Sequence, residues 1–126
     1  MKNRTIIRTA IVALAVGGAL LVLPKLSVGA EDQPATQTIK GEVVDLMCYL
    51  DHGAKGDGHK GCATKCIKGG GPVGLLTADN QLYLVIGDHK PINDTLADKA
   101  AQMVSLKGKV VERNGMKMIE GAEVVD

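Results

Sequence analysis

Residues 104–113 and 116–125 are two runs rich in β-branched and other apolar residues, and only Asn114 and Gly115 separate them. A two-residue hairpin turn of type I′ needs positive φ at both positions, which asparagine and glycine tolerate better than other residues. The pair is the strongest short hairpin signal that a sequence offers. We therefore expect a long antiparallel hairpin here, which commits this part of the chain to a β-sheet fold.

A second hairpin is predicted further upstream. Residues 73–78 and 81–87 are apolar runs, and the two residues between them are Asp79 and Asn80. Both can adopt positive φ in a tight turn. The chain therefore contains two hairpins, which provide four of its strands.

Three other elements surround the hairpins. Residues 38–47 carry β-branched residues in rough alternation, which predicts a strand that ends at Cys48. A short helix is expected from about 60 to 68, because residues 69–72, three glycines and a proline, are typical of a helix C-terminus. Residues 93–102 begin with polar capping residues and continue with helix formers, so a helix is expected between the hairpins.

Five strands with a helix between the third and the fourth form the layout of the OB-fold, a small five-stranded barrel. The segments 39–45 and 106–112 resemble the glycine-bent first and fourth strands common in such barrels. The expected fold class is thus mainly β, an OB-fold-like barrel with a short cysteine-bearing helix after its first strand. This architecture serves many unrelated functions, so it constrains the chemistry little.

The N-terminal residues have the character of a secretory signal peptide. A basic start, residues 1–8, precedes an uncharged apolar stretch, residues 9–23. The small residues Val28 and Ala30 then stand before Glu31 at the spacing of a cleavage site. These features predict export to the periplasm or the cell exterior.

Cleavage at this point defines the expected domain organisation. Residues 1–30 would be a removed signal, residues 31–37 a flexible lead-in, and residues 38–126 a single OB-like domain. The alternative is a retained membrane anchor, but the apolar stretch is shorter than the roughly 20 residues of a transmembrane helix. We expect no stable membrane span after cleavage.

Charge and composition argue against nucleic acid as a partner. The chain has 15 basic and 14 acidic residues, and Lys2, Arg4, Arg8 and Lys25 fall in the expected signal, so the exported domain is mildly acidic. It has no Trp, no Phe and only two Tyr residues. Nucleic acid binding generally requires a basic surface, and single strands also stack on aromatic side chains.

The only three cysteines, Cys48, Cys62 and Cys66, lie close together in the sequence, and His59 stands three residues before the second. The set has the composition of a Cys3His metal site. On a helix, Cys62 and Cys66 share one face with their Cα atoms about 6 Å apart, so two thiolates can converge on one ion. His59 should cap or precede that helix, and Cys48 would supply the third sulfur.

These donors suit zinc, and the soft thiolates equally suit copper(I). His52, in the glycine-rich stretch 52–61, is a candidate alternative nitrogen ligand. The sequence contains no nucleophile paired with a base at a convincing spacing, so we do not expect an enzyme. The first hypothesis is an exported, non-enzymatic domain that holds a transition metal in a structural, transfer or sensing role.

Export also supports a different hypothesis, because oxidising compartments favour disulfides. A bridge from Cys48 to Cys62 or to Cys66 would contribute about 3 kcal/mol and leave one free thiol. The protein would then be a disulfide-stapled binding module for another secreted or periplasmic protein or a small ligand, without metal. Catalytic thiol exchange is a third alternative.

The cysteine segment also carries a resemblance. The chain is similar to small secreted bacterial proteins of an uncharacterised family, which carry Cys-Tyr and then His-x-x-Cys-Ala-x-x-Cys before a Gly-Pro-x-Gly-Leu strand. Here these residues are Cys48-Tyr49, the segment 59–66 and the segment 71–75. The resemblance implies a secreted OB-like domain with a cysteine-rich insertion between its first two strands, and it carries over no activity.

Overall fold

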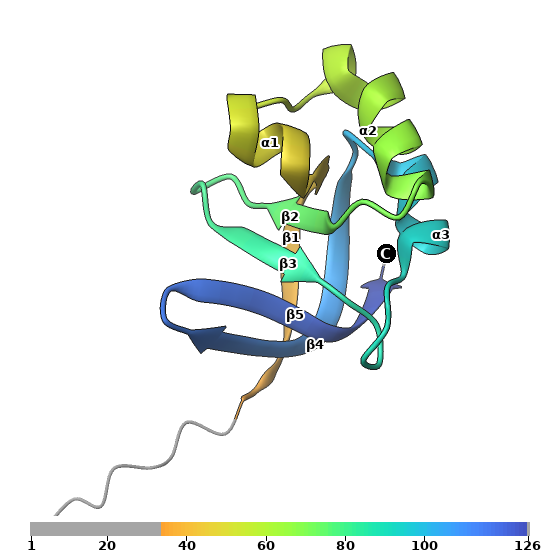
Figure 1. Cartoon of the computed structure of the whole chain (residues 1–126). Coiled ribbons are helices and arrows are strands. Elements are labelled where there is room, and N and C mark those ends of the chain that lie inside the picture. Colours follow the sequence, from red (N-terminus) through yellow and green to blue (C-terminus); the bar gives the residue numbers. More distant parts are fainter. Residues whose placement is uncertain (1–33, 126) are drawn as a thin grey trace, which may run out of the picture.

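A computed structural model describes residues 34–125 of the chain, and in this range five strands close into a barrel (Figure 1). The strand order is β1-β2-β3-β5-β4, and β4 pairs with β1 to close it. The mainly β, OB-fold-like barrel is therefore confirmed. In chain order the elements are β1 (Thr36–Asp45), α1 (Leu46–His52), the 3-10 turn η1 (Asp57–His59), α2 (Lys60–Lys68), β2 (Val73–Leu76), β3 (Leu82–Val85), α3 (Asn93–Leu96), the 3-10 turn η2 (Ala97–Lys99), β4 (Met103–Arg113) and β5 (Met116–Val125). The expected signal peptide, residues 1–30, lies outside the described residues.

Both hairpins form where the turn residues predict them. β4 and β5 pair antiparallel, and Asn114 and Gly115 have φ of 52° and 81° between them. β2 and β3 also pair antiparallel, with Asn80 at φ 60° in their turn. The barrel then closes through a parallel pairing of β3 with β5, which no local signal encodes.

The first strand differs from its prediction at both ends. It begins at Thr36, inside the segment expected to be a flexible lead-in, because Thr36 pairs with Lys109 of β4. It ends at Asp45 rather than at residue 47, because the Asp45 side chain caps a helix by accepting the Cys48 N–H at 3.0 Å. Cys48 therefore lies in the first turn of α1 and not at a strand end.

The helix α2 has the predicted bounds, and the glycine run ends it. The N–H groups of Gly70 and Gly71 donate to the carbonyls of Ile67 and Cys66. The Asn93 side chain donates to the carbonyls of Ile67 and Gly71, both at 2.7 Å, and so ties the end of α2 to α3. The helix predicted over residues 93–102 is shorter in the structure. It ends at Leu96, and the 3-10 turn η2 follows it.

The core lies inside the barrel and beneath α2. Its largest fully buried side chains include Val43, Ile67, Leu75, Leu96, Leu106 and Ile119. Because Ala63 and Ile67 are the buried residues of α2, this helix covers one end of the barrel and turns its other faces outward. Among residues 34–125, no helix is long and apolar enough to cross a membrane.

One prediction concerns the close approach of β1 to β2 at Gly41. A Cβ atom at Gly41 would lie 2.7 Å from the Leu76 carbonyl oxygen and 2.9 Å from Leu75 Cγ, so Gly41→Ala forces β1 and β2 apart. We expect a loss of about 2–3 kcal/mol in the free energy of unfolding, measured by urea denaturation. Gly58→Ala is the matched control, because a Cβ there meets nothing within 4 Å. Equal stability of the two variants would contradict this account of the contact at Gly41.

Candidate metal centre

Two short helices present the candidate ligands at one end of the barrel. Cys48 and His52 lie on α1, one turn apart, and His59 is the residue that precedes α2. Cys62 and Cys66 lie on α2, also one turn apart. Residues spaced in this way share a face of a helix. Figure 1 shows α1 and α2 above the barrel at the same end, joined by a short connection.

The connection that joins the helices turns at two glycines. Gly53 ends α1 with φ 71° and donates its N–H to the Tyr49 carbonyl, and Gly56 has φ 74°. The Gly56 N–H donates to the Glu42 carboxylate, which fixes the connection to β1. A side chain would strain either position, because positive φ is rare for residues with a Cβ. These contacts set the approach of α2 to α1.

The potential ligand atoms form two groups that share one sulfur. Cys48, His52 and His59 form the first group, and Cys48, Cys62 and Cys66 form the second. Within each group all ligand atoms lie within 4.8 Å of one another. Ligands about 2.3 Å from a tetrahedral ion lie about 3.8 Å apart, so a small closure of either group would bring its donors to the spacing of metal ligands.

The structure divides the predicted Cys3His set between these groups. His59 lies with Cys48 in the first, while Cys62 and Cys66 lie with Cys48 in the second. His52, which the sequence suggests as a substitute for His59, instead stands beside it. All five residues thus come together, with Cys48 at their centre.

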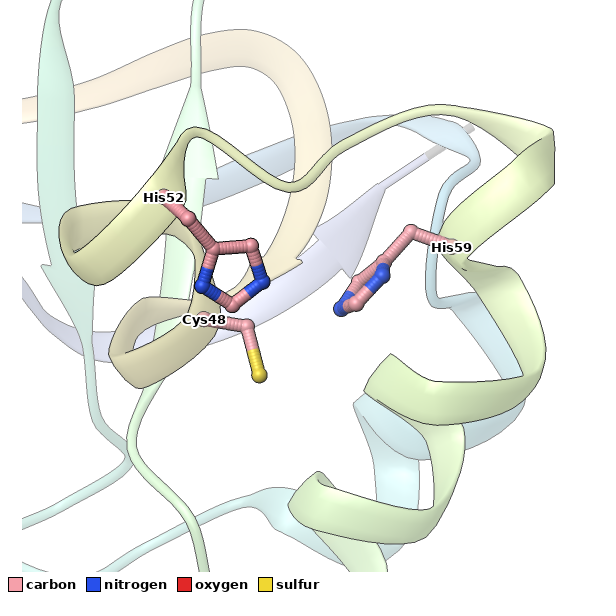
Figure 2. A group of neighbouring side chains, drawn as sticks. All are labelled: Cys48, His52 and His59. Atoms are coloured by element: carbon pink, nitrogen blue, oxygen red, sulfur yellow. The ribbon is translucent and has the colours of Figure 1, made fainter.

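The imidazoles of His52 and His59 lie next to each other in the space between the helices (Figure 2). Their ring centroids are 6.0 Å apart and their planes are nearly perpendicular, at 80°. His52 Nδ1 lies 3.1 Å from an Asp51 carboxylate oxygen, a contact that orients the ring. His59 Nε2 is buried and has no hydrogen-bond partner among the described residues. An unpaired buried polar atom costs about 1–3 kcal/mol, and a bound metal would satisfy this one.

The thiols differ in exposure and in acidity. Cys48 and Cys66 are half-buried, and Cys62 is exposed. A hydrogen bond to the Asp45 side chain, with burial and the charge of Asp45, raises the pKa of the Cys48 thiol to about 12. Burial, followed by the charge of Asp45, raises the pKa of the Cys66 thiol. Without metal these two thiols hold their protons, and a metal must displace them to bind the sulfurs.

Asp45 is a functional candidate that the sequence interpretation missed. Its side chain is 1% exposed, with one oxygen capping α1 and the other, Oδ1, without a partner among the described residues. The sequence pattern places it within a strand over residues 38–47, although an aspartate three residues before Cys48 is a possible helix N-cap. Its buried charge lies beside the sulfurs and would be offset by a bound cation.

No protein-family model matches the chain, and no curated protein and no solved structure is significantly similar to it. The barrel and the geometry of the two donor groups are therefore the grounds on which a function is proposed.

Proposed function

We propose that this protein is an exported, non-enzymatic domain that binds a soft transition-metal ion, copper(I) or zinc, through its cysteine and histidine side chains. The observation that supports this most strongly is the convergence of the two donor groups on the Cys48 sulfur. Thiolate and imidazole together are the donors that such ions prefer. Export rests on the signal-like character of residues 1–30.

The exposure of the ligands favours a transfer or sensing role over a purely structural one. Structural zinc sites are closed, with four protein ligands, whereas each donor group here offers three. Here Cys62 is exposed, and the His52 side chain is 55% exposed. An ion held between α1 and α2 would be within reach of another secreted or periplasmic protein, which could exchange it.

A thiol-protection experiment tests this proposal. Reduced protein is treated with iodoacetamide with and without one transition metal, zinc or copper(I), and the labelled cysteines are counted by mass spectrometry. We expect the metal to block alkylation of Cys48, Cys62 and Cys66, because a coordinated thiolate is a poor nucleophile. A chelator should restore full labelling.

The same experiment distinguishes the alternative functions. If all three reduced cysteines are labelled to the same extent with and without metal, the proposal is contradicted. If the isolated protein carries a disulfide that remains after metal is added, the disulfide-stapled binding module is the better description.

A further inference from the structure

We propose that the cluster holds two metal ions, with the Cys48 thiolate bridging an ion bound by Cys62 and Cys66 to an ion bound by His52 and His59. This inference rests on the proposed metal-binding function and deepens it. It assigns a number of ions and a distinct role to each donor.

The first support is the number of donors in each group. Each group offers three ligand atoms that are mutually close, and only Cys48 belongs to both. Three donors about 2.3 Å from an ion in a plane lie about 4 Å apart, which is within the spread of each group. Soft copper(I) is stable with three such ligands, so each group is sufficient for one copper(I) ion.

The second support is the placement of donors along α2. His59 precedes the helix, and Cys66 lies seven residues later in its second turn. A rise of 1.5 Å per residue separates their backbones by about 10 Å along the axis. Among residues 34–125, no group whose ligand atoms all lie within 4.8 Å of one another contains both residues. The two ends of the cluster are thus better matched to separate ions.

The third support is the chemistry of the shared atom. A thiolate sulfur has several lone pairs and can bind two ions, whereas an imidazole nitrogen has only one lone pair to give. The donor common to both groups is the thiolate of Cys48. It lies between α1 and α2, where both remaining pairs of ligands can reach it.

Charge also favours a second ion. Three thiolates bring three negative charges to the metal-loaded cluster. One copper(I) ion would offset one of them, and two would offset two, which lowers the repulsion between like charges that lie close together. On loading, each thiol proton leaves to solvent, and the copper stays in its +1 state.

An anaerobic copper(I) titration of the reduced protein against a chromophoric chelator tests this inference. We expect the protein to bind two equivalents. The double variants His52→Ala/His59→Ala and Cys62→Ser/Cys66→Ser should each bind one. His89→Ala is the matched control and should bind two, because His89 lies against Glu120 of β5 and outside both groups.

Each result has a distinct meaning. Saturation of the protein at one equivalent would overturn the two-ion inference and leave the metal-binding function intact. No binding of copper(I), and none of zinc in a parallel titration, would overturn both. X-ray absorption spectroscopy tests the bridge in the wild-type protein, so it does not depend on the folding of a variant. A short copper–copper distance in the loaded protein supports the thiolate bridge, and its absence at two equivalents would contradict the bridge.

Discussion

Replacing Cys48 by serine is expected to abolish tight metal binding. The Cys48 sulfur is the one ligand atom common to both donor groups, so its loss leaves each group with two donors. Removal of an outer-shell partner typically lowers metal affinity 10–100-fold, so loss of this shared ligand should lower it by more than about 100-fold. The measurement is competition for copper(I) with a chromophoric chelator.

Two features make this substitution a clean test. Serine is close to cysteine in size, and the N–H that residue 48 donates to the Asp45 cap belongs to the backbone, so α1 should persist. Cys62→Ser is the matched comparison, because it weakens only the sulfur group and should leave an ion at the histidines. Wild-type affinity in the Cys48→Ser protein would show that Cys48 is not a ligand.

Replacing Asp45 by asparagine is expected to make the Cys48 thiol much more reactive in the metal-free, reduced protein. The hydrogen bond to Asp45 and the charge of this carboxylate are among the causes that raise the pKa of Cys48 to about 12. A neutral amide removes the charge, so the pKa falls and more thiolate is present at any given pH. Because the thiolate is the nucleophile, alkylation near neutral pH should accelerate by about three- to fourfold for each unit that the pKa falls, since the tenfold gain in thiolate is partly offset by its lower nucleophilicity.

The measurement is the pH profile of Cys48 alkylation, which should move to lower pH in Asp45→Asn. The asparagine oxygen can still accept the Cys48 N–H, so the cap on α1 remains. Asp98→Asn is the control, because Asp98 pairs with Lys68 at 2.8 Å and is not a cause of the Cys48 shift. An unchanged profile would mean that Asp45 does not control the thiol.

The parts of the fold that were predictable are those with local signals. Asn114 and Gly115 specify their hairpin by conformation alone, and the glycines at 69–71 fix the end of α2. The helix α1 was not predictable in this way, because Leu46 belongs to the pattern over residues 38–47 that predicts a strand. It forms because Leu46 packs on β2, where a Cβ at Gly74 would lie 2.6 Å from Leu46 Cδ2.

The candidate site also has a part that the sequence predicts and a part that only tertiary structure determines. The spacing of His59, Cys62 and Cys66 depends on one helix, and the sequence was enough to place all three on it or at its start. The sharing of Cys48 between two groups depends on how α1 meets α2. That contact arises from tertiary structure, through the glycine turns and the Glu42 contact with Gly56, and no periodicity in the sequence reports it.

High-resolution native mass spectrometry tests the central claim most directly, because one spectrum reports both bound metal and the state of the thiols. The protein would be produced with its own N-terminal segment and purified without chelator. We expect a species that carries a transition metal, with all three cysteines free of disulfides once the metal is removed. A metal-free chain lighter by two hydrogen atoms, with one remaining thiol that reacts with iodoacetamide, would contradict the account.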